Sequence, residues 1–132
     1  MTTPSLARKG IILFAHGSRD PLWHQPIAAV AQEIIAIDPH AAVECAYLEL
    51  STPDLHTASN RLMANGVQWI SILPMFLGVG KHAREDLPLL VQSLRSQYPH
   101  IHFELQAAVG ENTRLIKLLA TLAQESLQTN AP

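Results

Sequence analysis

Short apolar runs alternate with amphipathic segments four times along this chain of 132 residues. Residues 10–15, which begin with a glycine, form a continuous apolar run that is typical of a central parallel strand covered on both faces. Similar runs predict strands at 43–50, 67–75 and 101–109. The pattern therefore predicts four strands, each followed by a helix.

The segments after the strands carry apolar residues at helical spacing. Asp38-Pro39 closes the first helix, and the segment 51–54 supplies a cap residue, a proline and an acid for the start of the second. Asn112 is expected to cap the fourth helix. The four apolar stripes contain Ile27, Val30, Ala31, Ile34 and Ile35; Leu55, Ala58 and Leu62; Leu87, Leu90, Val91 and Leu94; and Leu115, Leu118, Leu119 and Leu122.

Strands separated by helices imply right-handed βαβ units and a parallel sheet. We therefore predict a single α/β domain over 1–132, with a four-stranded parallel sheet flanked by helices in the flavodoxin-like order 2-1-3-4. Its core is expected to span about 10–127, with tails at 1–9 and 128–132. In this order the first and third strands are neighbours where the winding reverses, and ligands bind beyond the carboxyl ends of such strands.

Composition and charge exclude several classes of protein. Apolar residues make up 48% of the chain and charged residues 15%, which argues against disorder and against a coiled coil. The formal net charge of −2 gives no electrostatic reason to expect nucleic-acid binding. With Cys45 as its only cysteine, the chain has no internal disulfide framework and no cysteine-rich zinc site. The apolar stretch 11–15 is too short for a signal peptide or a membrane span, so a cytoplasmic protein without a membrane partner is expected.

Two histidines follow apolar runs and are expected in loops that also carry glycine and a basic residue. His16 follows the first predicted strand and His82 the third, so the predicted strand order brings both to the ligand crevice. Imidazole binds borderline divalent ions such as Co²⁺, Fe²⁺ and Ni²⁺, and it accepts protons near neutral pH. The pair therefore predicts a metal site or a proton-transfer site, open enough for an ion that must leave again.

Further candidates surround these histidines. Glu49, at the end of the second predicted strand, could add a carboxylate or assist proton removal; the alternative is an acid with no role in the site. Arg19, Lys81 and Arg84 lie within three positions of a candidate histidine and indicate an anionic ligand, carboxylated or phosphorylated. Ordinary solvated loop charge is the other interpretation, because acids lie next to these cations.

Other motifs near the histidines are weaker. Ser18 and Asp20 lie close to His16 without a nucleophile-elbow pattern, so a hydrolytic triad is not expected, and Ser18 is kept as a substrate-binding candidate. The segment 78–80 has two glycines and lacks the third of a dinucleotide fingerprint. It either lets the loop approach a flat ligand closely or simply turns. His24 could line the mouth of the crevice.

Four segments of the chain together resemble one enzyme family. They are AHGSRDP at 15–21, YLEL at 47–50, PMFLGVGKH at 74–82 and DLP at 86–88. These segments are similar to those of the short CbiX-type sirohydrochlorin chelatases, which belong to the class II chelatases. The resemblance runs from about residue 10 to residue 122 and keeps both histidine segments in the expected order.

Enzymes of that class insert a divalent metal into a tetrapyrrole without ATP. The resemblance implies that His16 and His82 are the metal-binding and catalytic histidines. It also implies sirohydrochlorin, an anionic tetrapyrrole, and a divalent ion as substrates, no permanently bound cofactor, and a homodimer whose two crevices face each other. The carboxylates of sirohydrochlorin would give the three cations a purpose. Co²⁺, for cobalamin synthesis, is the favoured ion, with Fe²⁺ for sirohaem as the runner-up and Ni²⁺ also used by related enzymes.

Two functions of other classes stay open. A non-catalytic carrier of metal or tetrapyrrole would use the same crevice and bind stoichiometrically without accelerating insertion. A phosphohydrolase with a phosphorylated histidine would need a basic residue just before His16 to hold the phosphate, and residue 15 is alanine.

Overall fold

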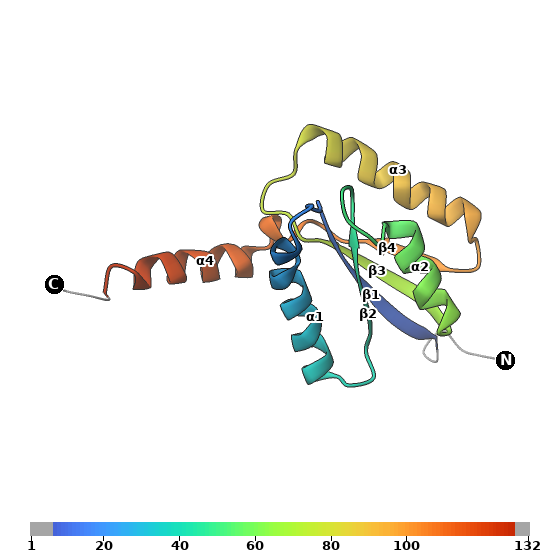
Figure 1. Ribbon diagram of the computed structural model, residues 1–132, viewed down its shortest axis with the longest axis horizontal. Coiled ribbons are helices and arrows are strands. Elements are labelled where there is room, and N and C mark those ends of the chain that lie inside the picture. The colour runs from blue at the N-terminus through green and yellow to red at the C-terminus, as the bar shows by residue number, and fades with distance from the viewer. Residues whose placement is uncertain (1–6, 129–132) are drawn as a thin grey trace.

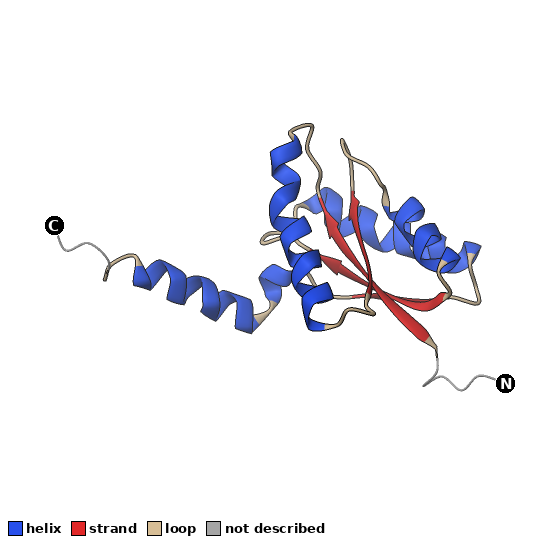
Figure 2. Cartoon of the chain, turned by 60° about the horizontal axis from the view of Figure 1, so that its bottom comes forward, coloured by secondary structure: helices blue, strands red, loops and turns tan. Residues whose placement is uncertain are grey.

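In the computed structural model, which describes residues 7–128, four strands form one parallel sheet in the order β2-β1-β3-β4 (Figure 2). The strands are β1 Arg8–Ala15, β2 Ala42–Tyr47, β3 Val67–Pro74 and β4 His102–Leu105. The predicted α/β class and strand order are both confirmed. β1 and β3 therefore lie side by side at the point where the winding reverses.

Helices cover this sheet from two sides (Figure 1). The helical elements are the short 3-10 helices η2 Pro21–His24 and η3 Val109–Glu111, and the α-helices α1 Gln25–Ile37, α2 Leu55–Ala64, α3 Lys81–Gln97 and α4 Thr113–Glu125. α1 packs on one face of the sheet, and α2 and α3 pack on the other. α4 extends away from the sheet. None of the helices in residues 7–128 is both long and apolar enough to cross a membrane.

β1 is buried on both faces, which explains its unbroken apolar run. Ile12 and Phe14 pack into a core beneath α2 and α3, whereas Leu13 and Ala15 pack into a second core beneath α1. The side chains alternate because successive residues of a strand point to opposite faces of the sheet. A central parallel strand with helices on both faces needs apolar residues at every position.

The second strand is shorter than its apolar run predicted. β2 ends at Tyr47 rather than at residue 50. The chain turns back there, because the Tyr47 N–H donates to the Pro53 carbonyl at 2.9 Å and Leu50 adopts a positive φ of 63°. Glu49 consequently lies in the loop after the strand and not at the strand end.

The other strand limits also differ from the prediction. β1 begins at Arg8 instead of residue 10, β3 ends one residue before the predicted 75, and β4 ends at Leu105 instead of residue 109. The chain after β4 forms η3, whose Gly110 N–H donates to the Phe76 carbonyl at 2.9 Å. The predicted tails lie largely outside the described residues, since 1–6 and 129–132 are not described.

α3 begins earlier than the apolar pattern indicated. Its first residue is Lys81, whereas its predicted apolar stripe starts at Leu87. The first turn is polar, so apolar periodicity does not reach it. The prediction that His82 lies in a loop is therefore wrong, because it is the second residue of α3. Pro88 lies inside this helix, where it has no N–H to donate to the Arg84 carbonyl.

Backbone hydrogen bonds hold the end of β1 and the loop after it to the neighbouring loops. The Glu49 N–H donates to the His16 carbonyl at 2.9 Å, on the β2 side. On the β3 side, the Met75 N–H donates to the Phe14 carbonyl at 2.7 Å. The parallel ladder thus continues beyond the ends of β2 and β3, and it fixes the main chain of His16 relative to the loop after β2.

Gly17 allows the loops after β1 and β2 to approach this closely. Its φ is +108°, in the region that favours glycine, and a Cβ built on it would lie 1.8 Å from the Glu49 carbonyl oxygen. No side chain fits there without moving the backbone. Glycine at position 17 is therefore required by both its conformation and its surroundings.

Replacing Gly17 with alanine is expected to lower the free energy of unfolding by about 1–3 kcal/mol more than the same change at Gly66. Gly66 is a matched control, because it also has a positive φ, +82°, while a Cβ built on it would meet nothing within 4 Å. Urea denaturation of Gly17→Ala and Gly66→Ala would measure both effects. Equal losses would show that the contact with Glu49 does not constrain the loop.

Asp54 caps α2, and its carboxylate accepts the Thr57 N–H at 2.8 Å. This backbone hydrogen bond, with a smaller contribution from the Thr57 hydroxyl, lowers the pKa of Asp54 below its usual value. Asp54→Ala should cost about 1 kcal/mol of stability at neutral pH. A group with a lowered folded-state pKa stabilises above its unfolded pKa, so the cost should shrink as the pH falls through the lowered pKa.

Denaturation of the wild-type chain, Asp54→Ala and Asp54→Asn across acidic pH would test this cap. Asp54→Asn keeps an acceptor for the Thr57 N–H and removes the titrating group, so it should retain most of the stability at every pH. A loss in Asp54→Ala that stays constant down to the most acidic pH would contradict the role of the ionised carboxylate.

Candidate functional site

His16 and His82 line one cleft beyond the carboxyl ends of β1 and β3. We call it the histidine cleft; its volume is about 580 Å³. The strand order brings the two segments together, as the sequence predicted. Glu49 and Lys81 also lie in the cleft. Its complete lining is His16, Leu48, Glu49, Gly80, Lys81, His82, Ala83 and Asp86.

The ring of His16 rests on an aromatic side chain from the other histidine segment. Its imidazole stacks on Phe76, with ring centroids 4.3 Å apart and an angle of 29° between the planes. Phe76 is itself buried, and it meets Phe14 edge to face at 6.2 Å. His16 is exposed, so one face of its ring is supported while its polar edge is accessible to a ligand.

His82 comes from the first turn of α3, with Gly80 as the residue that precedes the helix. Asp86 lies four residues further along, so the two side chains occupy the same side of the helix. Both line the histidine cleft and both are exposed. Sequence reasoning missed Asp86 as a site residue, although the spacing of four from His82 was the signal that could have found it once the helix start was known.

Ser51 connects the loops after β1 and β2 beside the cleft. Its hydroxyl donates to the Ser18 carbonyl at 2.7 Å and accepts the Ser18 N–H at 2.9 Å. His24 Nε2 lies 2.9 Å from the same oxygen. The Ser51 hydroxyl has one proton and donates it in the hydrogen bond to the Ser18 carbonyl. Its oxygen therefore accepts from His24, which carries its proton on Nε2. His24 therefore braces this loop pair, and it does not line the histidine cleft.

The metal-binding capacity of the cleft is limited. Among residues 7–128, no group of three or more histidine, cysteine, aspartate or glutamate side chains is arranged to hold a metal ion. Two imidazoles with nearby carboxylates form a weak and open set of ligands. Such a set suits an ion that passes through better than one held permanently.

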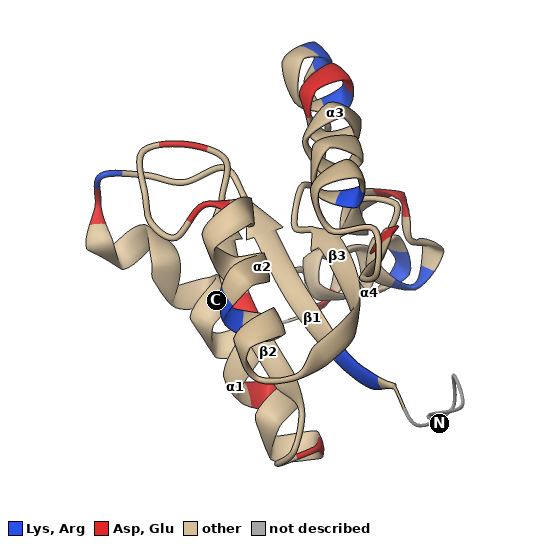
Figure 3. Cartoon of the chain, turned by 90° about the vertical axis from the view of Figure 1, so that its right-hand side faces the viewer, with Lys and Arg blue, Asp and Glu red and all other residues tan. Residues whose placement is uncertain are grey.

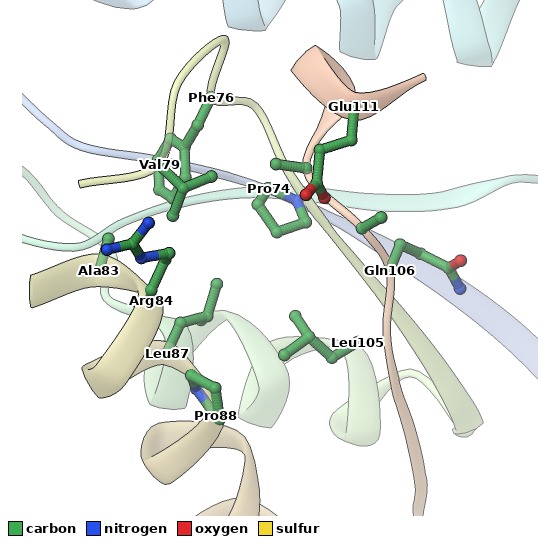
Figure 4. Close-up of a pocket in the computed structure, with 12 residues that line it drawn as sticks. Pro74, Phe76, Val79, Ala83, Arg84, Leu87, Pro88, Leu105, Gln106 and Glu111 are labelled. Carbon is green, nitrogen blue, oxygen red and sulfur yellow. The ribbon is translucent and has the colours of Figure 1, made fainter. Parts of the chain in front are cut away.

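The candidate anion-binding residues divide among three hollows. Lys81 lies in the histidine cleft, whereas Ser18 and Arg19 line a neighbouring hollow of about 330 Å³ beside His24. Arg84 lines a third, largely apolar pocket of about 170 Å³, with Glu111 across from it (Figure 4). Lys81 and Arg84 lie three residues apart at the start of α3 and line adjacent hollows that share Ala83, whereas Arg19 comes from the loop after β1 and lines a separate hollow.

Each of these cations is nevertheless available to a ligand. In the described part of the chain, no carboxylate lies within ion-pair distance of Arg19, Lys81 or Arg84. Acidic and basic residues lie next to each other at the start of α3 (Figure 3). The adjacent acids thus do not neutralise these cations by direct pairing.

The glycines of the β3–α3 loop are not forced by close packing. A Cβ built on Gly78 or on Gly80 would meet nothing within 4 Å. The space in front of this loop is therefore open to solvent or to a ligand.

Cys45 lies away from the cleft and is partly buried, and burial raises the pKa of its thiol. It is not a reactive thiolate.

Several known proteins are similar to this chain in sequence. The chain is 26% identical over 123 residues to a sirohydrochlorin cobaltochelatase from Priestia megaterium, matching 89% of this chain and 38% of that protein. It is 25% identical over 118 residues to a sirohydrochlorin cobaltochelatase from Sulfolobus acidocaldarius, matching 89% and 92%. A sirohydrochlorin ferrochelatase from Bacillus subtilis is 26% identical over 110 residues, matching 83% and 42%.

The chain spans less than two thirds of the length of several of these relatives, including the Priestia and Bacillus proteins. Among solved structures, a CbiX protein named for cobalamin biosynthesis from Marinobacter aquaeolei superposes with a TM-score of 0.79 and 32% identity. That match covers 92% of this chain and 99% of the other. The family model named CbiX matches residues 10–126. The chain therefore belongs to the CbiX family.

Proposed function

We propose that this chain is a sirohydrochlorin metal chelatase, which inserts Co²⁺ into the tetrapyrrole without ATP and works as a homodimer. The observation that carries the proposal is the position of His16 and His82 in a single open cleft. The two histidines come from distant parts of the sequence, and the strand order alone brings them together. Relatives named as sirohydrochlorin chelatases support the substrate class.

Metal insertion requires an ion to enter the macrocycle while two pyrrole N–H protons leave. Neutral imidazoles suit both parts of this exchange, because they bind borderline divalent ions and accept protons near neutral pH. In the proposed mechanism His16 and His82 first hold the ion loosely and then release it to the pyrrole nitrogens. The same imidazoles take up the protons that the metal displaces.

The stacked position of His16 fits this exchange. Phe76 covers one face of the imidazole and restricts its plane, so the ring is preorganised before substrate arrives. Glu49 and Asp86 add carboxylates to the same cleft. We assign them a supporting part, as transient ligands or as proton acceptors that pass the protons to solvent.

The unpaired cations match a polycarboxylated substrate. Lys81 lies inside the cleft, while Arg19 and Arg84 line the other two hollows. Carboxylates at the rim of a flat macrocycle spread over a wide area, so separated cations can each meet a different group. In this proposal the division of the basic residues among three hollows reflects the size of the ligand.

Cobalt is the proposed ion because two of the relatives compared above are named as cobaltochelatases. The Bacillus relative is named as a ferrochelatase, and imidazole and carboxylate ligands do not by themselves separate Co²⁺ from Fe²⁺ or Ni²⁺. The choice of metal therefore rests on similarity and not on the ligand set. The cytoplasmic location expected from the sequence stays a prediction.

His16→Ala and His82→Ala should each lower the rate of cobalt insertion by at least about 100-fold, since each removes a ligand and proton acceptor. His82 is exposed, so its replacement should alter the free energy of unfolding by no more than about 0.5 kcal/mol. His16→Ala also loses the stacking on Phe76 and should cost about 0.5–1.5 kcal/mol. An anaerobic absorbance assay of sirohydrochlorin with Co²⁺, Fe²⁺ or Ni²⁺ would measure the rates.

His100→Ala is the matched control for this assay. His100 is an exposed histidine in the turn before β4, at the opposite end of the sheet from the cleft. The His100→Ala variant should retain full activity. Wild-type rates in either cleft variant would defeat the histidine assignment. Stoichiometric binding of sirohydrochlorin or Co²⁺ with no acceleration over the protein-free reaction would instead identify a carrier.

Arg19→Gln, Lys81→Gln and Arg84→Gln should each raise the KM for sirohydrochlorin by roughly 3- to 10-fold with little change in kcat. Each substitution removes a charge that binds the substrate and takes no part in proton transfer. Arg61→Gln provides the control, because Arg61 on α2 pairs with Glu44, away from the cleft. Unchanged KM values in all three variants would contradict the carboxylate-binding role.

A further inference from the structure

Leu50, in the loop after β2, has an unusual backbone conformation. Its φ is 63°, and within residues 7–128 it is the only residue other than glycine with a positive φ. This left-handed region brings Cβ close to the following carbonyl oxygen, so it costs free energy for every residue except glycine. A bulky residue such as leucine is rare there, whereas glycine and asparagine are common. The leucine at this position therefore needs a reason.

Hydrogen bonds on both sides impose this conformation. Before Leu50, the Glu49 N–H donates to the His16 carbonyl at 2.9 Å. After Leu50, the Ser51 hydroxyl donates to the Ser18 carbonyl at 2.7 Å and accepts the Ser18 N–H at 2.9 Å. The chain must turn sharply between these contacts, and glycine would allow the turn without the steric cost of a Cβ. The hydrogen bonds thus explain the turn but not the leucine side chain.

The fold of the described chain does not use the Leu50 side chain. Leu48, two residues earlier, packs against the core beneath α2 and α3, whereas Leu50 belongs to neither core of the sheet. The Leu50 residue is 56% exposed. A single exposed leucine is ordinary, but an exposed leucine that also carries a conformational cost is not. Residues held in such conformations cluster at binding and active sites.

Leu50 lies at the boundary between two hollows of the site. Glu49 lines the histidine cleft with His16 and His82, and Leu50, the next residue, lines the hollow that contains Arg19. An apolar side chain thus stands between the groups proposed to hold the metal and a cation proposed to bind a carboxylate. A flat macrocycle with a metal at its centre and carboxylates at its rim presents the same order, because its apolar ring lies between the two.

We infer that Leu50 is a substrate-binding residue, whose side chain packs on the apolar ring of sirohydrochlorin between the metal-binding centre and a carboxylate bound by Arg19. The inference rests on the proposed function, because it takes the tetrapyrrole as the ligand. It adds an apolar contact to the histidines and cations already assigned. Packing of the leucine on the ring removes apolar surface from water, and this gain offsets the conformational cost of leucine at position 50.

Leu50→Gln and Leu50→Met test whether the apolar character of the side chain matters. Both new side chains are unbranched, similar in length and subject to the same cost of a positive φ, but only methionine is apolar. Leu50→Gln should raise the Kd for metal-free sirohydrochlorin, measured by absorbance titration, by roughly 5- to 20-fold, and Leu50→Met should raise it less. In the insertion assay Leu50→Gln should raise KM by a similar factor with little change in kcat, because the leucine takes no part in proton transfer.

Leu89→Gln is the matched control for binding. Leu89 is a leucine on α3 that is 63% exposed, and it lines none of the three hollows of the site. Its replacement should leave the Kd for sirohydrochlorin unchanged. A rise in Kd as large as that of Leu50→Gln would show that any exposed leucine has this effect, and it would overturn the inference.

Leu50→Gly and Leu50→Ala test the conformational cost. Both variants lack the apolar side chain, so both should bind sirohydrochlorin more weakly than the wild-type chain. Leu50→Gly should nevertheless unfold at a urea concentration roughly 0.5 M higher than Leu50→Ala, because only glycine adopts the positive φ freely. Equal urea midpoints would show that position 50 carries no such cost, and the reason for assigning the leucine to a ligand would be lost.

The outcomes separate this inference from the proposed function. A wild-type Kd in Leu50→Gln would overturn the inference, while acceleration of insertion by the wild-type chain would leave the chelatase in place. Binding that depends on Leu50 without any acceleration would support the contact and contradict the chelatase. A wild-type chain that does not bind sirohydrochlorin would exclude both. Light scattering should give Leu50→Gln the wild-type mass; a lower mass would assign the leucine to a contact between copies and overturn its role in binding.

Discussion

The position of β1 between β2 and β3 is the constraint on which the site depends. The Glu49 N–H binds the His16 carbonyl on the β2 side, and the Met75 N–H binds the Phe14 carbonyl on the β3 side, so the end of β1 and the start of the loop carrying His16 are fixed. Gly17 makes this possible, because only a residue without a Cβ can lie against the Glu49 carbonyl. The cleft is therefore a direct product of sheet register, and the exposed histidine is held by backbone contacts and not by burial of its own side chain.

The architecture could be predicted from the sequence because it follows from strong periodic signals. The run through Ile12 and Phe14 is apolar at every position since both faces of β1 are covered. Four such runs separated by amphipathic helices admit few topologies, and the one that reverses its winding after β2 brings His16 and His82 together. The predicted histidine pair was therefore a consequence of topology as much as of residue type.

Details that depend on local polar contacts could not be predicted in this way. The first turn of α3 is polar, so nothing in the apolar pattern indicated that His82 is helical or that Asp86 shares its side of the helix. Ser51 carries no signal of its own, because its role arises from hydrogen bonds to Ser18 and His24 that require the folded loops. Likewise, the three cations were grouped by sequence distance, whereas the fold lines three different hollows with them.

α4 shows another limit of pattern reasoning, and its connection to the sheet reaches the site. Its apolar stripe predicts that the helix packs against another surface, but the periodicity does not identify that surface. The helix is joined to the domain by η3, whose Gly110 packs against the backbone of Leu77 and donates to the Phe76 carbonyl. Phe76 in turn supports the ring of His16. A short, well-anchored segment thus stands between α4 and the imidazole, so the direction in which α4 leaves the sheet and the geometry of the cleft depend on one structural element.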